Sequence, residues 1–535
     1  MSKKWLIIIG IAVTVIGTAI GFISSGGISY LYVPEGETEI KLAGSPSSQV
    51  TADVKRANSG FNELMQENKA KLTRRVMLYI AEGDAAYEQV LTREFNEDSS
   101  AARDIVKISG GWSGGKIAVT ALNAKAGVMA NKSERYMTTA HELYHQMQYE
   151  LSNGNNSGEN SIFWLEEGSA DYVGAKLAEK LGGKKFEKWV LDTELTLLGA
   201  TDIADINKLG ATNLKERKDI MRTYTHAYQQ SDIMCYFLLE KYAKGREIAK
   251  LNEFFGALKN NDALAAFAKT FGVSLKDFLE QFKAWQRAEQ QNFKFTVTAR
   301  EGVSAAAKNN IARELSKAKN MLSTRFGINM AGNYAIVLAK DNSDLANALV
   351  TMCSMDKKEA DDIAKTSLWI ENGSTVLINT GELKDNKQII FTTGSMLMRM
   401  YQTQRLDDSK PSIEWLTRGA GYIAGVTALI NSGEGSLNSY LANWRQNLRQ
   451  RPLPNLADMR TKENFNQIAS AYSDDTAAML CEAAVAELIM DSGYESIANW
   501  QEMARENINV EKTFSAAFGK NLSAFENKIS LTLLK

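Results

Sequence analysis

The second half of this 535-residue chain repeats short motifs of the first half in the same order. The four matched pairs are Thr138–His145 with Thr392–Arg399, Trp164–Gly168 with Trp415–Gly419, Ala227–Tyr228 with Ala471–Tyr472, and Phe271–Phe278 with Phe518–Phe525. Their offsets are 254, 251, 244 and 247 residues, too similar for four independent coincidences. Self-similarity of this kind indicates a repeated structural unit. The sequence therefore predicts two copies of one fold, over residues 51–295 and 296–535.

Helices are expected to dominate each copy. Only 5 prolines interrupt the chain, which favours long helices. A few short apolar segments, such as Val76–Ile80 and Lys116–Leu122, have the pattern of strands. Apolar residues make up 44% of the chain, enough for packed cores. The predicted fold class is α+β, mainly helical, with two tandem domains of one type.

Charge and cysteine content exclude some classes of protein. The chain has 62 basic and 63 acidic residues and no basic stripe, so we expect no nucleic-acid partner. The cysteines Cys235, Cys353 and Cys481 lack metal-site spacing and are too few for a disulfide scaffold, so we interpret them as unpaired thiols.

A basic start and a long apolar segment occupy the first thirty residues. Met1–Lys4 carries two lysines, and the 19 residues Trp5–Ile23 are almost entirely apolar. As a helix this segment would be about 28 Å long, close to the thickness of a bilayer core. Residues 1–29 are therefore predicted to be an uncleaved signal anchor, followed by a stalk over residues 30–50. The remaining chain would be anchored to a membrane and extracytoplasmic, at the cell surface or in a periplasm. The alternative is a cleaved signal and a secreted protein.

Two of the three histidines lie four residues apart in His141-Glu142-Leu143-Tyr144-His145. On a helix, residues i and i+4 project from one face, so both imidazoles can bind a single metal ion. Glu142 is the residue after His141 on the same helix, where a carboxylate can polarise a metal-bound water instead of binding the metal.

A third ligand is expected from a helix shortly downstream, because a catalytic zinc site has three protein ligands and one open position. Glu167, in the segment Phe163–Tyr172, is the candidate ligand. Asp171 follows one turn later on the same face, where it can accept the second N–H of a zinc-bound histidine.

This combination of motifs resembles a known family. His-Glu-x-x-His followed by Trp-Leu-x-Glu-Gly-x-Ala is similar to the gluzincin zinc metallopeptidases, especially the aminopeptidase-N-like branch, and Glu-x-x-x-Asp resembles the thermolysin-type arrangement. The resemblance implies tandem thermolysin-like domains, one Zn²⁺ per chain held by His141, His145 and Glu167, Glu142 as general base, and a second-sphere role for Asp171.

The same resemblance implies a tyrosine that stabilises the oxyanion. Tyr228, before an apolar helix, is at the matching position, with Tyr224 and His226 as alternatives. Two departures stand out: 21 residues separate His145 from Glu167, slightly more than in the aminopeptidases, and no Gly-x-Met-Glu-Asn segment is present. In place of that segment, the strand Lys116–Leu122 is an alternative substrate-binding element, as an edge strand that pairs with an extended peptide.

The second copy lacks the ligands. Ser395 and Arg399 replace the two histidines, Met396 replaces the general base, and Arg418 replaces the glutamate ligand. Only Tyr472 matches its counterpart. Guanidinium groups repel Zn²⁺ and do not lose their proton to bind it. The second copy is therefore expected to be a degenerate, inactive peptidase-like repeat.

The leading hypothesis is a membrane-anchored zinc peptidase that hydrolyses peptide or protein substrates. One alternative is a zinc hydrolase of a non-peptide amide or ester. Another is a non-catalytic scaffold whose zinc ion stabilises a binding or assembly surface. The intact Glu142 argues against a scaffold, because a structural zinc site needs no general base and usually has four protein ligands.

Overall fold

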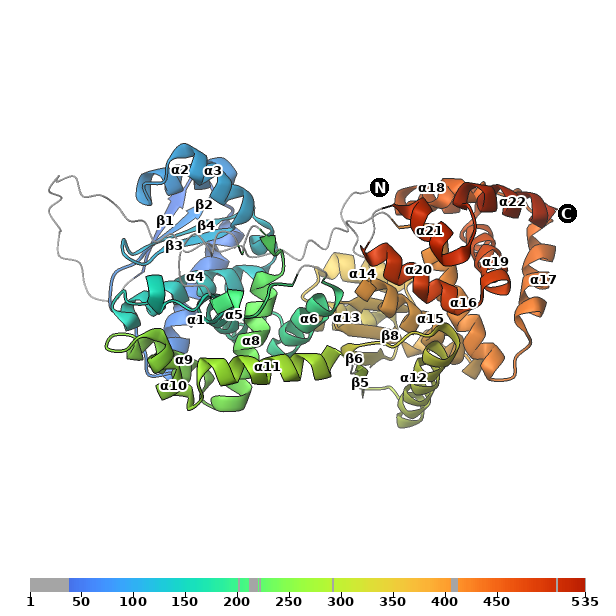
Figure 1. The fold of residues 1–535 in the computed structure, drawn as a ribbon. Helices are drawn as coiled ribbons and strands as arrows, with labels where there is room; N and C mark the ends of the chain where they lie inside the picture. The colour runs from blue at the N-terminus through green and yellow to red at the C-terminus, as the bar shows by residue number, and fades with distance from the viewer. Residues whose placement is uncertain are drawn as a thin grey trace. The chain divides into compact units, whose positions relative to one another are not determined.

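The computed structural model describes residues 38–200, 203–210, 220, 223–290, 293–405, 412–506 and 509–534. The chain divides into two compact units, the first ending at Ala288 and the second beginning at Glu289. Figure 1 colours the first unit from blue to green and the second from yellow to red. The division lies seven residues before the boundary that the repeated motifs predicted, residue 295.

The first unit contains a small sheet and a larger helical part. Its elements are β1 (Glu39–Ala43), α1 (Ser48–Glu67), β2 (Met77–Ala81), α2 (Asp84–Glu94), α3 (Ser99–Ile108), β3 (Gly111–Gly114), β4 (Val119–Asn123), η1 (Gly127–Met129), α4 (Lys132–Ser152), η2 (Gly158–Asn160), α5 (Phe163–Lys180), α6 (Phe186–Gly199), η3 (Lys208–Gly210), α8 (Ala227–Tyr242), α9 (Glu247–Ala257), α10 (Ala263–Phe271) and α11 (Leu275–Gln290).

The second unit has a similar order of elements. They are β5 (Phe293–Ala299), α12 (Ala305–Phe326), β6 (Gly332–Ala339), α13 (Asn342–Cys353), α14 (Lys357–Thr366), β7 (Trp369–Asn372), β8 (Thr375–Asn379), η4 (Thr380–Glu382), α15 (Asn386–Arg405), α16 (Glu414–Asn431), α17 (Leu437–Leu448), η5 (Leu456–Met459), α18 (Lys462–Tyr472), α19 (Asp474–Ser492), α20 (Glu495–Glu506), α21 (Val510–Phe518) and α22 (Leu522–Leu534).

Both units have a four-stranded sheet with one topology. The strand orders are β1-β2-β4-β3 and β5-β6-β8-β7, and in each sheet only the last strand is antiparallel to its neighbour. In the first sheet, Leu78 and Ile80 pack with Val54 of α1, whereas Ala81 and Ala121 face Tyr87 of α2. This alternation follows from the two-residue period of a strand and buries both faces of the sheet.

The sheet order corrects two expectations. The strand expected at Lys116–Leu122 is β4, which begins at Val119 and lies between β2 and β3, so it is not an edge strand. The edge strands are β1 and β3, and sequence patterning did not single out either as an edge. Residues 30–50 were expected to form a stalk with room for one short strand. A short strand is present as β1, but it pairs in parallel with β2, and α1 begins at Ser48, so the described part of this segment belongs to the first unit.

The repeated aromatic residues lie at equivalent places in the two cores. Trp164 of α5 stacks on Phe278 of α11 with ring centroids 5.1 Å apart, and Trp415 of α16 stacks on Phe525 of α22 at 6.0 Å. Large aromatic side chains contribute strongly to core stability because each buries a large apolar area. The match between these motifs therefore reflects a shared packing arrangement.

The prediction of a transmembrane helix is wrong for the structure that is described. Across the described ranges, which begin at residue 38, no helix is both long enough and apolar enough to cross a membrane. The expected anchor, residues 1–29, and residues 30–37 of the expected stalk lie outside those ranges. The fold is corrected to a mainly helical protein with two small sheets, and the membrane partner and the localisation inferred from the anchor are withdrawn.

Candidate metal centre

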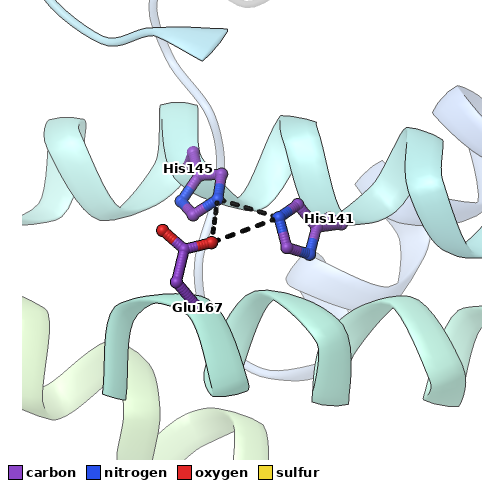
Figure 2. Close-up of side chains that lie close together, drawn as sticks. All are labelled: His141, His145 and Glu167. Atoms are coloured by element: carbon purple, nitrogen blue, oxygen red, sulfur yellow. Dashed lines mark hydrogen bonds and ion pairs between the residues drawn. The ribbon is translucent and has the colours of Figure 1, made fainter. Parts of the chain in front are cut away.

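Helices α4 and α5 pack against each other and bring three predicted ligands together. His141 and His145 lie one turn apart on α4, and Glu167 faces them from α5 (Figure 2). The two Nε2 atoms are 3.0 Å apart, and Oε2 of Glu167 is 3.6 Å from Nε2 of His141 and 3.5 Å from that of His145. All three side chains are buried, with exposures of 5% or less.

These separations fit a tetrahedral metal ion. Ligand atoms bound at ~2.0–2.1 Å to a tetrahedral ion lie about 3.3 Å from one another. The three observed separations, 3.0, 3.5 and 3.6 Å, bracket that value. Oε2 of Glu167 makes no hydrogen bond to a described residue, so it is available as a ligand.

Hydrogen bonds fix the orientation of both imidazoles. Nδ1 of His141 is 2.7 Å from Oδ1 of Asp171, and Nδ1 of His145 is 2.8 Å from Oε1 of Gln148. The amide nitrogen of Gln148 donates to the Glu166 carbonyl, which leaves its oxygen as the acceptor for His145. In its neutral form each ring therefore carries its proton on Nδ1 and presents the Nε2 lone pair to the centre.

Two lone pairs 3.0 Å apart repel each other unless a proton or a metal cation lies between them. The residues present therefore fit a metal ion by donor type, spacing and tautomer, and the buried group of His141, His145 and Glu167 is able to hold one. Gln148 was missed by sequence reasoning, although it is matched in the repeat by Gln402 at the same offset as the histidine segment.

Glu142 is fully buried beside the three ligands, and the Ser113 side chain is close enough to lower its pKa, although neither carboxylate oxygen makes a well-formed hydrogen bond to a described residue. The backbone of the edge strand β3 lies against it. A Cβ atom built at Gly111 would overlap Oε1 of Glu142, so the absence of a side chain at this position makes room for the carboxylate. Ser113, two residues later on β3, donates to the backbone carbonyl of Glu142 and holds α4 against the strand.

The electrostatics of the group favour a bound cation. Burial lowers the pKa of His141, but the charges of Asp171, Glu142 and Glu167 outweigh it and raise this pKa to about 9. Burial raises the pKa of Glu142, although His141 and His145 oppose the shift. The cluster thus places the carboxyl groups of Asp171, Glu142 and Glu167 together in a buried site, and their negative charge favours either protonated histidines or a bound divalent cation.

Asp232 of α8 is a further buried carboxyl group that sequence reasoning missed. Its pKa is raised well above its usual range by burial, then by the charge of Asp171 and a hydrogen bond with it. Asp232 follows Ser231, whose carbonyl oxygen lies so close to α5 that a Cβ atom at Gly168 would overlap it. Only a three-dimensional contact brings Asp232 near Asp171, because 60 residues separate the two in the sequence.

The three alternatives for the oxyanion donor lie at or just before the start of α8. Tyr228 is buried and its ring packs edge-on against Phe163, the first residue of α5, at a centroid distance of 5.8 Å. The hydroxyl of Tyr224 accepts a hydrogen bond from Lys208 at 3.3 Å. His226 is the N-cap residue of α8. No distance distinguishes them as donors, so the role of Tyr228 stays a prediction.

The equivalent helices of the second unit carry different chemistry. Ser395 and Arg399 are the tenth and fourteenth residues of α15, the places that His141 and His145 occupy in α4. Arg418 is the fifth residue of α16, as the glutamate ligand is of α5. The group of potential ligands found among the described residues lies in the first unit alone.

Tyr472 is not the counterpart of Tyr228. It is the last residue of α18 and is 40% exposed, whereas Tyr228 lies in the first turn of α8. The carbonyl oxygen of Ser231 lies close to Gly168, and that of Cys481 lies similarly close to the matching Gly419. When α8 is aligned with α19 on these contacts, the residue equivalent to Tyr228 is Ala478.

Comparisons with protein-family models, curated proteins and solved structures found no match to this chain. The geometry of the site is therefore the basis for any functional conclusion.

Proposed function

We propose that the first unit is a zinc-dependent peptidase. The observation that supports this most directly is the Glu142 carboxylate, which is buried beside three potential ligands and makes no well-formed hydrogen bond to a described residue. Three protein ligands leave the fourth position of a tetrahedral zinc ion open, as catalytic sites require. A buried carboxylate without a well-formed hydrogen bond is costly in a structural site but suits a general base.

His141, His145 and Glu167 would hold the ion, with Asp171 and Gln148 fixing the two histidine tautomers. A zinc ion held there would supply Lewis-acid chemistry, which lowers the pKa of water and polarises a carbonyl group. Glu142 accepts the proton of the attacking water and delivers it to the leaving amine. Tyr228 donates a hydrogen bond to the developing oxyanion, with Tyr224 and His226 as the alternative donors.

A zinc-stabilised scaffold is the second candidate, because all three ligands are buried at 5% exposure or less. A non-peptide amide or ester remains an alternative substrate for the same hydrolytic site. Glu142→Gln distinguishes catalysis from a scaffold, since the amide keeps the size of the side chain and removes its basicity.

The test uses the full chain loaded with zinc and mixed with a diverse peptide library, with cleavage read by mass spectrometry. We expect cleavage by the parent protein only, and one zinc ion per chain in both the parent and Glu142→Gln. Cleavage by both proteins would contradict the role of Glu142. Zinc binding without cleavage by either protein would favour the scaffold.

A further inference from the structure

The second unit contains a cleft where the first unit has its candidate metal centre. This cleft has a volume of about 900 Å³ and is lined by Ser395 and Arg399 of α15 and by Arg418 of α16. These are the three helix positions that hold the potential ligands in the first unit. The volume is within the range of about 300–1,000 Å³ typical of sites for small ligands.

The lining of the cleft has an excess of positive charge. Two acidic residues, Glu382 and Asp385, accompany five basic ones, and three of the basic residues also form ion pairs with carboxylates outside the lining. The basic residues are Lys365, Lys384, Lys387, Arg399 and Arg418. A concave surface with charge of one sign concentrates ligands of the opposite sign.

Arg399 is the half-buried basic residue of the lining that has no ion pair with a described carboxylate. Its one hydrogen bond to a described residue goes to neutral Gln402 at 3.3 Å. The nearby Glu414 already accepts a hydrogen bond from Arg418 at 2.7 Å. Burial raises the pKa of Glu371, the other nearby carboxyl group, to about 7, so it is only partly ionised at neutral pH.

Both guanidinium groups are held in place by the protein. Gln402 donates to the Thr417 carbonyl and accepts from Arg399, so it orients this arginine as Gln148 orients a histidine in the first unit. Arg418 lies over the ring of Phe465 at 4.0 Å. An arginine that is stacked and pre-oriented in this way loses little conformational entropy when it binds a carboxylate.

The remaining lining favours an organic ligand of peptide type. Trp369, Phe391 and Tyr422 contribute aromatic surface. Trp369 belongs to β7, the last strand in the sheet order, whose outer edge is not paired with another described strand. An extended peptide can form backbone hydrogen bonds to such an edge.

We propose that this cleft binds a short acidic peptide, with a carboxylate group held between the guanidinium groups of Arg399 and Arg418. The site does not depend on the activity proposed for the first unit. A guanidinium forms paired hydrogen bonds with a carboxylate, so the binding should discriminate a carboxylate from its amide.

The test measures binding of the peptide acetyl-Phe-Glu-Glu-amide to the full chain by calorimetry, in a Glu142→Gln background so that the first unit does not consume it. The matched probe is acetyl-Phe-Gln-Gln-amide. We expect Arg399→Gln and Arg418→Gln each to weaken binding of the acidic peptide about tenfold or more. Arg449→Gln, an exposed change of the same charge outside the cleft lining, should leave binding unchanged.

Equal affinity of the parent cleft for the Glu-Glu and Gln-Gln peptides would overturn the proposal, and this comparison needs no substitution in the cleft. Equal losses in Arg399→Gln and Arg449→Gln would also overturn it, because net charge alone would then explain binding. Inorganic phosphate that binds more tightly than the peptide and displaces it would reassign the cleft to phosphate. Thermal melting of each variant checks that the second unit is folded.

Discussion

Gly111 sets the space available to the proposed general base. Because a Cβ atom here would overlap Oε1 of Glu142, we expect Gly111→Ala to displace the carboxylate while leaving the metal ligands in place. A displacement of about 1 Å can cost about 100-fold in rate. The measurement is kcat together with metal content. Gly114→Ala, on the same strand but against Ile117 and Phe95, is the control and should retain activity. Unchanged kcat in Gly111→Ala would contradict the placement of Glu142.

Gln148 offers a second test at the residue scale, with a control built into the repeat. Gln148→Leu removes the acceptor that fixes the tautomer of His145, so we expect metal affinity to fall about 10- to 100-fold. The equivalent change, Gln402→Leu, removes the matching hydrogen bond to a helix carbonyl in the second unit and should leave metal affinity unchanged. Competition with a metal indicator measures both. Equal losses would show that the effect is general destabilisation.

The candidate ligands were predictable because their pattern is local or nearly so. His141 and His145 share a helix face, and Glu167 lies on the next long helix. Gln148 and Asp232 were not predicted. Gln148 contacts His145 within α4, but its amide is oriented by the Glu166 carbonyl of α5, and Asp232 reaches Asp171 from α8. A single sequence does not reveal these contacts between helices. The same limit explains why β4 was interpreted as an edge strand, since strand order is a non-local property.

At the scale of elements, the crossing of α5 and α8 depends on the small size of Gly168. A Cβ atom there would overlap the backbone carbonyl oxygen of Ser231, which has no flexible end that can move aside. We expect Gly168→Ala to lower the free energy of unfolding by about 1–3 kcal/mol, as overpacked core positions do. Chemical denaturation measures this change.

Gly256 of α9 provides the matched control for that substitution. No atom lies within 4 Å of a Cβ built there. Gly256→Ala should therefore raise the free energy of unfolding by about 0.5–1 kcal/mol, because alanine is the better helix former. If the two substitutions change stability in the same direction, then the close approach of α5 and α8 does not limit the size of the side chain at position 168.

At the scale of the whole molecule, one framework carries two sites of opposite charge preference. Equivalent positions on α4 and α15 hold His145 and Arg399, and those on α5 and α16 hold Glu167 and Arg418. The hydrogen bonds of Gln148 and Gln402 are the same in both units, so the framework is kept while the residues that would meet a ligand differ. The first site suits a cation, and the second suits an anion.

This separation predicts how the full chain responds to metal removal. A metal that binds only the folded first unit stabilises it by about 3 kcal/mol at a 100-fold excess over its dissociation constant. For a unit of this size that corresponds to a shift of about 6–12 °C in melting temperature. We expect a chelator to lower one calorimetric transition by this amount and to leave the transition of the second unit in place, because each unit has its own sheet and packed core. His141→Ala should abolish the chelator effect and so assign the shifted transition to the first unit. If both transitions shift together, the units unfold as one cooperative body.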